Sequence, residues 1–195
     1  MYFGYPLGFM LKYLVIGTLP RHIFSIVTGF LLQLYMFREQ FIHPLIMTAV
    51  VYLLMNVLPR NQQHKAILVF VMGYLSSQHI YRMITNFGGW DMDITTYTMI
   101  LTAKLSALGF CYRDGGEKDT DLLPEQVENK VVKMPSVIEI LSYVYFSSGC
   151  ICGPFFEYSD YVMFIEKRGR YQNIPSTVVP SLIKFLKGKR KIVTL

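Results

Sequence analysis

The sequence is poor in charged residues. Only 16% of its 195 residues are charged, whereas a soluble globular domain averages about 25%. Ten of the charged residues lie within residues 113–133, so the rest of the chain carries even less charge. This distribution argues against a soluble domain.

Cysteine is also scarce, and the motifs of several enzyme classes are absent. The three cysteines, Cys111, Cys150 and Cys152, are an odd number and suggest no disulfide framework. The sequence has no P-loop, G-x-S-x-G or H-E-x-x-H motif. The four histidines lie far apart without metal-ligand spacing, so we expect no metal site. They are His22, His43, His64 and His79.

Long apolar runs take the place of the missing charge. Uncharged stretches of 16 to 20 residues are close to the roughly 20 that a membrane-spanning helix needs. Backbone polar groups in lipid must be paired internally, so such runs form helices. The sequence therefore predicts an all-α, polytopic integral membrane protein, with residues 1–195 forming a single membrane domain. The six predicted membrane segments are residues 2–19, 22–37, 41–58, 66–81, 94–112 and 137–156.

Two charged stretches stand outside these segments. Residues 113–135 combine charge with apolar residues at spacings of about four or five, and Pro124 suits a first helical turn, so we predict a short amphipathic interfacial helix. Residues 184–195 form a basic tail that is either solvated or lies on an anionic membrane surface. The net charge of +6 does not indicate nucleic-acid binding, because most basic residues sit singly at the ends of apolar runs.

The positive-inside rule does not decide the orientation in the membrane. If all six segments cross, seven basic residues lie on one side and five on the other, and the basic tail reverses this balance to seven against ten. The first side would hold Arg21, Arg60, Lys65, Arg113, Lys118, Lys130 and Lys133, and the second Arg38, Arg82, Lys167, Arg168 and Arg170.

A few polar or helix-breaking residues within or beside the apolar runs are candidate site residues. Lys104 and Glu139 lie in adjacent predicted segments, where they either pair, reach the interface separately or serve function. Asp114, before two glycines, either binds a polar headgroup or caps the next element. Gly153 and Pro154 predict a kink, which lipid tolerates only where protein or a cavity satisfies the freed backbone groups.

Two blocks of the sequence resemble a known family. LTAKLSALGFCYRDGG (residues 101–116) and MPSVIEILSYVYFSSGCICGPFFEYSDYVMFIE (residues 134–166) are similar to the lysophospholipid acyltransferase branch of the membrane-bound O-acyltransferases. The matching positions are Leu101, Thr102, Lys104, Leu108, Asp114, Gly115, Pro135, Ser136, Glu139, Tyr143, Gly153, Pro154, Phe156, Tyr158, Asp160 and Tyr161.

The resemblance implies transfer of an acyl group from acyl-CoA to a lysophospholipid hydroxyl in the endoplasmic reticulum membrane. Acyl-CoA would be a co-substrate, with no bound cofactor. Lys104, Asp114, Glu139, Gly153, Pro154, Tyr158 and Asp160 would lie in or near the substrate chamber. The family's catalytic histidine and asparagine follow the second block in "WHG" and "WN" contexts, and neither context occurs here, since the one tryptophan, Trp90, precedes Asp91.

The resemblance covers only the N-terminal half of the family's sequence. We therefore expect an N-terminal portion of an MBOAT fold that has no catalytic residue of its own and is inactive alone. The alternative is a non-catalytic membrane scaffold or partner-binding protein. A small transporter ranks last, because the sequence shows no internal repeat.

Overall fold

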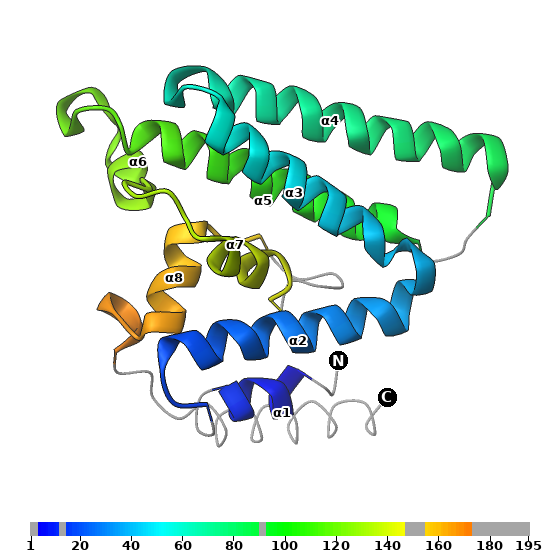
Figure 1. Ribbon diagram of the computed structural model, residues 1–195, viewed down its shortest axis with the longest axis horizontal. Coiled ribbons are helices and arrows are strands. Elements are labelled where there is room, and N and C mark those ends of the chain that lie inside the picture. The colour runs from blue at the N-terminus through cyan, green and yellow to red at the C-terminus, as the bar shows by residue number, and fades with distance from the viewer. Residues whose placement is uncertain (1–3, 12–14, 90–92, 147–154, 173–195) are drawn as a thin grey trace, which may run out of the picture.

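The computed structural model describes residues 4–11, 15–89, 93–146 and 155–172, and every regular element in these ranges is a helix. The all-α prediction is therefore confirmed. Four long helices run side by side in alternating directions (Figure 1). They are α2 (Thr18–Phe37), α3 (Ile42–Val57), α4 (Arg60–Thr85) and α5 (Ile94–Asp114).

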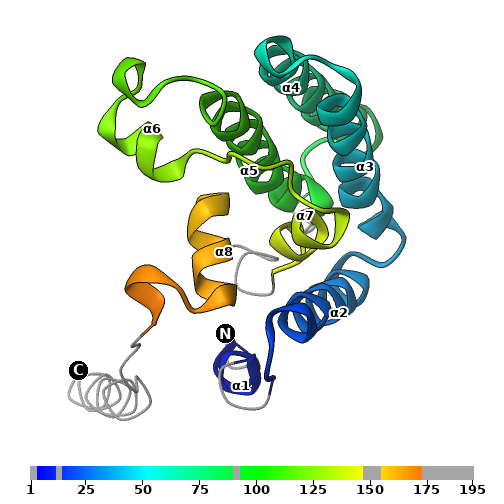
Figure 2. The same ribbon diagram turned by 60° about the vertical axis from the view of Figure 1, so that its left-hand side comes forward.

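Shorter elements complete the fold. Helices α7 and α8 lie between α2 and α5 (Figure 2), and α7 contacts both α2 and α3. The short elements are α1 (Gly4–Phe9), η2 (Arg38–Phe41), η3 (Asp119–Asp121), α6 (Pro124–Asn129), α7 (Val137–Val144), α8 (Tyr158–Glu166) and η5 (Gly169–Tyr171).

The core is centred on α5, whose buried apolar residues recur at the three- and four-residue spacing of one helix face. This face packs most extensively against α4 and also contacts α3. Large apolar side chains on the outer faces of α2, α3 and α4 are exposed, as expected of surfaces that meet lipid. The buried core residues of α3, α4 and α5 include Met47, Val51, Met55, Ile67, Val71, Tyr97, Leu101, Leu105 and Leu108.

Four of the six predicted membrane segments coincide with long helices. Residues 22–37, 41–58, 66–81 and 94–112 correspond to α2, α3, α4 and α5. Within the described residues, two helical stretches are long and apolar enough to cross a membrane, Thr18–Val57 and Ile94–Asp114. The first of these reverses direction at Arg38, where φ is 48°.

The first predicted segment, residues 2–19, is wrong as a continuous helix. Helical structure is interrupted at Val15 and Ile16, and α2 begins only at Thr18. Gly17 has a φ of 99°, which glycine adopts without the steric penalty of a side chain. This residue is the N-cap at which α2 begins.

The sixth predicted segment, residues 137–156, is also wrong as a continuous helix. Helix α7 has eight residues and ends at Val144, and residues 155–157 are not helical. Eight residues extend about 12 Å, compared with about 30 Å for the bilayer core. The apolar run here therefore contains a short helix, and the described residues that follow it, 145–146 and 155–157, are not helical.

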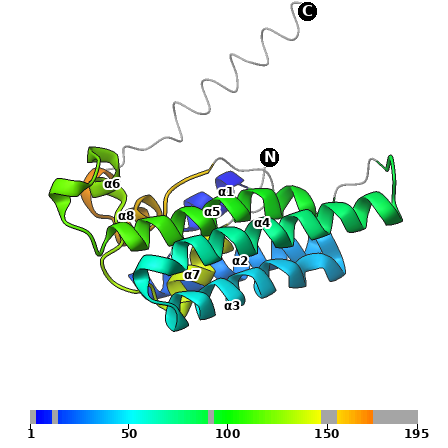
Figure 3. The same ribbon diagram turned by 90° about the horizontal axis from the view of Figure 1, so that it is seen from above.

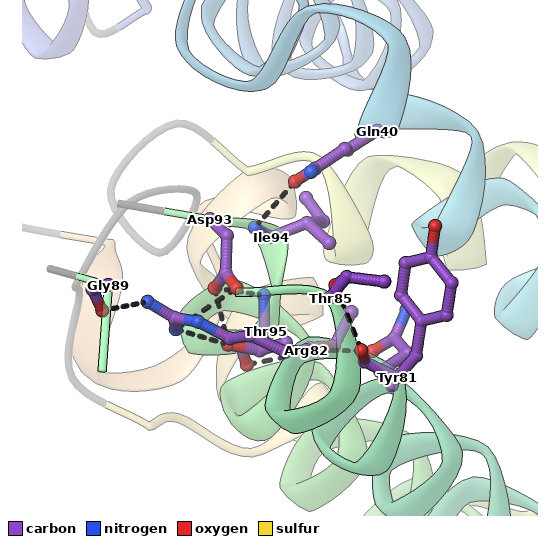
Figure 4. Close-up of polar contacts among 10 residues, drawn as sticks. Gln40, Tyr81, Arg82, Thr85, Gly89, Asp93, Ile94 and Thr95 are labelled. Carbon is purple, nitrogen blue, oxygen red and sulfur yellow. Dashed lines mark hydrogen bonds and ion pairs between the residues drawn. The ribbon is translucent and has the colours of Figure 1, made fainter. Parts of the chain in front are cut away.

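The N-terminal end of α5 is tied to its neighbours by polar contacts (Figure 4). The Asp93 carboxylate accepts a hydrogen bond from the Thr95 backbone N–H (3.1 Å) and pairs with Arg82 of α4 (3.0 Å). The side chain of Gln40 in η2 accepts a hydrogen bond from the Ile94 N–H (3.0 Å). An acidic N-cap also complements the positive end of the helix dipole.

The predicted amphipathic helix within residues 113–135 is present but short. Helix α6 has six residues and begins at Pro124, as the first-turn proline predicted. Its contact with the membrane surface stays a prediction. The basic tail, residues 184–195, lies outside the described residues.

Candidate functional site

Lys104 lies in the middle of α5 and is 0% exposed. Its Nζ donates to the Tyr143 carbonyl oxygen at 3.2 Å. The same nitrogen lies 4.0 Å from the centre of the Phe156 ring and 4.8 Å from the centre of the Tyr143 ring. A backbone carbonyl and two aromatic faces therefore stabilise the ammonium group within the protein.

The second donor from α5 to α7 is Tyr97, which is also 0% exposed. Its hydroxyl donates to the Val144 carbonyl oxygen at 2.7 Å. Tyr97 and Lys104 are seven residues apart, so both project from one face of α5. The last carbonyls of a helix have no partner within it, and here α5 side chains supply two of the missing donors. We call Tyr97, Lys104, Tyr143, Val144 and Phe156 the Lys104 junction.

Glu139 does not pair with Lys104: among the ion pairs of the described chain, none joins these two residues. Glu139 instead forms a capping box with Ser136. Its carboxylate accepts from the Ser136 N–H (2.7 Å), and its own N–H donates to the Ser136 hydroxyl oxygen (3.3 Å). The S-x-x-E pattern in the sequence could have revealed this cap.

Tyr158 belongs to an aromatic cluster that joins α7, α8 and the non-helical residues 155–157 before α8. The Tyr143 ring lies 5.6 Å from the Phe156 ring, 5.5 Å from the Tyr158 ring and 5.6 Å from the Tyr161 ring. The Tyr143 hydroxyl also donates to the Phe156 carbonyl oxygen at 2.8 Å. Burial, reinforced by the charge of Glu139, raises the pKa of Tyr158, so its hydroxyl remains protonated at neutral pH.

Glu157 adjoins this cluster and was not singled out from the sequence. Burial raises the pKa of its carboxyl group, and the Cys111 thiol, which donates to it across 3.7 Å, acts in the opposite direction. Asp160 is engaged elsewhere, in an ion pair with Arg170. Gly153 and Pro154 lie outside the described residues.

Asp114, the last residue of α5, is buried and hydrogen-bonded to the side chains of Arg113 and Gln126. It is 4% exposed, and its carboxylate accepts from the Arg113 guanidinium (2.6 and 2.9 Å) and from the side-chain amide of Gln126 in α6 (3.1 Å). Asp114 is not the N-cap of η3 or of α6, whose N-caps are Lys118 and Leu123; it ties the end of α5 to α6 through the Gln126 side chain. Headgroup binding by Asp114 stays a prediction.

The C-terminal end of α5 leaves no backbone carbonyl of its last turn without a donor. Backbone N–H groups donate hydrogen bonds to three of these four carbonyl oxygens, and the Arg60 side chain donates to the fourth. The pairs are Gly115 and Val131 to Cys111, Gly116 to Arg113, Glu117 to Asp114, and Arg60 Nε to Tyr112.

Arg60, in the first turn of α4, reaches three carbonyl groups at once. Its Nε donates to the Tyr112 oxygen (2.6 Å), and its Nη2 donates to the oxygens of Val131 (2.7 Å) and Val132 (2.8 Å). The guanidinium carbon also lies 4.0 Å from the centre of the Tyr112 ring. A planar, multidentate cation suits this bridge.

Gly115 permits the close approach on which this bridge depends. A Cβ atom at Gly115 would lie 2.0 Å from the Val131 carbonyl oxygen. The glycine is therefore required for space. We call Arg60, Tyr112, Gly115, Val131 and Val132 the Arg60 corner.

His22 and Ser142 form a buried contact that sequence reasoning missed. His22 Nδ1 lies 2.6 Å from the Ser142 hydroxyl oxygen, and Ser142 donates to the Glu139 carbonyl oxygen at 2.8 Å. The signal in the sequence was a polar or small residue every three or four positions along one face of α2: His22, Ser25, Gly29 and Gln33.

Other histidines also make local contacts. His43 Nδ1 lies 2.8 Å from the Tyr74 hydroxyl, and the His64 ring lies 5.1 Å from the Phe110 ring. Within the described residues, no group of three or more histidine, cysteine or acidic side chains is arranged to hold a metal ion.

Comparison with known proteins identifies the family. The model of the membrane-bound O-acyltransferase family matches residues 80–190, which include the Lys104 junction. Membrane-bound glycerophospholipid O-acyltransferase 2 of Gallus gallus is 36% identical over 150 residues, which are 76% of this chain and 29% of the relative. Lysophospholipid acyltransferase 6 of Drosophila melanogaster is 32% identical over 147 residues, covering 75% of this chain and 20% of the relative.

Lysophospholipid acyltransferase 5 of Mus musculus is 28% identical over 190 residues, covering 96% of this chain and 38% of the relative. The chain thus spans between a fifth and two fifths of the length of these three relatives. The resemblance of its two sequence blocks is confirmed: this chain belongs to the membrane-bound O-acyltransferase family.

Proposed function

We propose that this chain is part of an acyltransferase that transfers an acyl group from acyl-CoA to a lysophospholipid in the endoplasmic reticulum membrane. The observation that carries this proposal is the family match over residues 80–190, together with relatives named as lysophospholipid and glycerophospholipid acyltransferases. The substrates would be two amphipathic molecules held within a membrane protein.

The reaction would join a hydroxyl group to a thioester carbon. The lysophospholipid oxygen attacks the acyl carbonyl carbon, the carbon–sulfur bond breaks, and CoA leaves as a thiol after receiving the hydroxyl proton. A general base would assist this step. No histidine of this chain occupies the family's catalytic motif, and the contacts of His22 with Ser142 and of His43 with Tyr74 support structural roles for these two.

The contribution that we assign to this chain is a rigid support. Lys104 and Tyr97 fix the end of α7, and the Tyr143 and Phe156 rings pack on the Lys104 ammonium. Such contacts position neighbouring chain; they do not move protons in the reaction. On this view, the chain by itself transfers no acyl group.

A chimera tests the proposal. The matched 150 residues of this chain would replace the corresponding region of the Gallus gallus relative, and microsomes would receive labelled acyl-CoA and a panel of lysophospholipids. We expect the chimera to transfer the acyl group and the chain alone to show no transfer. The unmodified relative serves as the positive control.

A chimera that integrates into membranes at the level of the relative but forms no labelled phospholipid would contradict the proposal. Co-purification of this chain with a full-length acyltransferase would then favour the alternative, a non-catalytic scaffold.

A further inference from the structure

The four long helices give the molecule two distinct ends. One end holds the first residues of α2 and α4 and the last residues of α3 and α5. The other end holds η2, the last residues of α4 and the first residues of α5 (Figure 1). We call the first the Arg60 end and the second the Arg82 end. Figure 3 shows the same alignment of the long helices from above.

Helices α6 and α8 both lie at the Arg60 end. Helix α6 follows the end of α5, and the Ser159 hydroxyl in α8 donates to the side-chain oxygen of Asn129 in α6 at 2.8 Å. The last turn of α8 is attached to the start of α2, because Arg21 donates to the Ile165 carbonyl oxygen at 2.9 Å. These two contacts place α8 between α6 and the N-terminal end of α2, with both of its ends attached to elements of the Arg60 end.

The position of α8 changes the distribution of basic residues deduced from the sequence. A sixth membrane crossing would have put Lys167, Arg168 and Arg170 opposite Arg60. Because α7 is only eight residues long and α8 returns to the Arg60 end, these three residues join that end.

Lysine and arginine are therefore strongly asymmetric in the described chain. Apart from Lys104 in mid-helix, ten basic residues lie at the Arg60 end and two, Arg38 and Arg82, at the Arg82 end. The ten residues are Arg21, Arg60, Lys65, Arg113, Lys118, Lys130, Lys133, Lys167, Arg168 and Arg170.

Short loops rich in lysine and arginine stay on the cytoplasmic side of a membrane, and acidic residues have little influence on this choice. We infer that the Arg60 end, with residues 113–136 and the α8–η5 segment, faces the cytoplasm and its anionic lipid headgroups, and that the Arg82 end faces the opposite compartment. The inference rests on charge and topology and does not depend on the proposed catalytic function.

Labelling of single cysteines tests this orientation. In a background with Cys111→Ala, Cys150→Ser and Cys152→Ser, the exposed positions Glu125 in α6 and Glu39 in η2 would each be changed to cysteine. Sealed microsomes that contain each variant would be treated with a membrane-impermeant maleimide before and after permeabilisation. We expect Glu125→Cys to react in sealed vesicles and Glu39→Cys only after permeabilisation.

The reverse pattern, or equal reactivity of both positions in sealed vesicles, would overturn the inference. Trypsin treatment of the unmodified chain provides a second measurement without substitutions. We expect cleavage after Lys118 and Lys133, both exposed, in sealed vesicles, and cleavage after Arg38 only in opened ones. Protection of Lys118 and Lys133 together with cleavage at Arg38 would equally overturn it.

Discussion

The Lys104 junction and the Arg60 corner solve the same problem with different cations. In each, a basic side chain donates to backbone carbonyls at the C-terminal end of a neighbouring helix and also contacts an aromatic ring. Lys104 is completely buried and reaches one described carbonyl between two rings, whereas the half-buried Arg60 reaches three carbonyls.

The difference follows from the chemistry of the two side chains. A compact ammonium group fits between aromatic faces in the interior, and a planar guanidinium group bridges several acceptors near the surface. Both complement the negative end of a helix dipole. The comparison teaches that basic residues in this chain act as caps for helices with which they share no sequence neighbourhood.

Reversal of the charge at Lys104 gives the largest expected effect. In Lys104→Glu, an anion would face the Tyr143 carbonyl oxygen and the negative faces of two rings. An uncompensated buried charge lowers the free energy of unfolding by about 3–5 kcal/mol. The melting temperature of the chain in detergent measures the loss, with Lys104→Arg as the charge-preserving control. Equal stability of Lys104→Glu and wild type would contradict the junction.

A methyl group at Gly115 should disrupt the Arg60 corner. Gly115→Ala would place Cβ 2.0 Å from the Val131 carbonyl oxygen, and we expect a loss of about 3 kcal/mol from this overlap. Gly73→Ala is the matched control, because a Cβ there meets nothing within 4 Å. The same melting assay should show Gly73→Ala at or slightly above wild type. A tolerated Gly115→Ala would show that the corner is not tightly packed.

Arg60→Lys tests whether the planar guanidinium group, or only the positive charge, matters at the Arg60 corner. Lysine cannot reach three carbonyl groups with one planar head, so we expect a loss of about 2 kcal/mol. Faster proteolysis of residues 113–135 would report the same loss locally. Lys65→Ala, an exposed basic position on the same helix, should leave the rate unchanged. If residues 113–135 of Arg60→Lys resist proteolysis as well as those of the wild type, only the positive charge of Arg60 matters and not its planar guanidinium group.

Tyr97→Phe gives the smallest expected effect and isolates one hydrogen bond of the junction. The change removes the donor to the Val144 carbonyl oxygen and leaves the ring in place. Loss of this bond should lower the free energy of unfolding by about 1 kcal/mol. Tyr81→Phe, at a side chain that is 69% exposed, is the control and should have no effect. A neutral Tyr97→Phe would mean that water replaces the lost donor.

The sequence predicted the helical class and four long helices because their apolar runs are long and bounded by charge or by turn residues. It failed at residues 137–156 because an apolar run has the same appearance whether it meets lipid or protein. Only the tertiary donors Tyr97 and Lys104 show why α7 can end at Val144.

At the candidate site, Lys104 was found because charge is rare in apolar helices, and Asp114 because it precedes two glycines that end a helix. Their partners were not found, since a backbone carbonyl acceptor leaves no trace in composition. The sequence suggests Glu139 as a partner of Lys104, yet the described contacts of Lys104 include a carbonyl oxygen and two rings. Arg60 was read only as a loop charge, because its three acceptors lie 52 to 72 residues away.

The last carbonyls of α7 and the neighbouring aromatic rings, and not Glu139, stabilise the buried Lys104 ammonium group. A pair of double-mutant cycles tests this claim most directly. Melting would be measured for Lys104→Met with Phe156→Leu, and for Lys104→Met with Glu139→Gln. We predict a coupling of about 1 kcal/mol in the first cycle and additivity within about 0.5 kcal/mol in the second. Coupling to Glu139 and additivity with Phe156 would contradict the account.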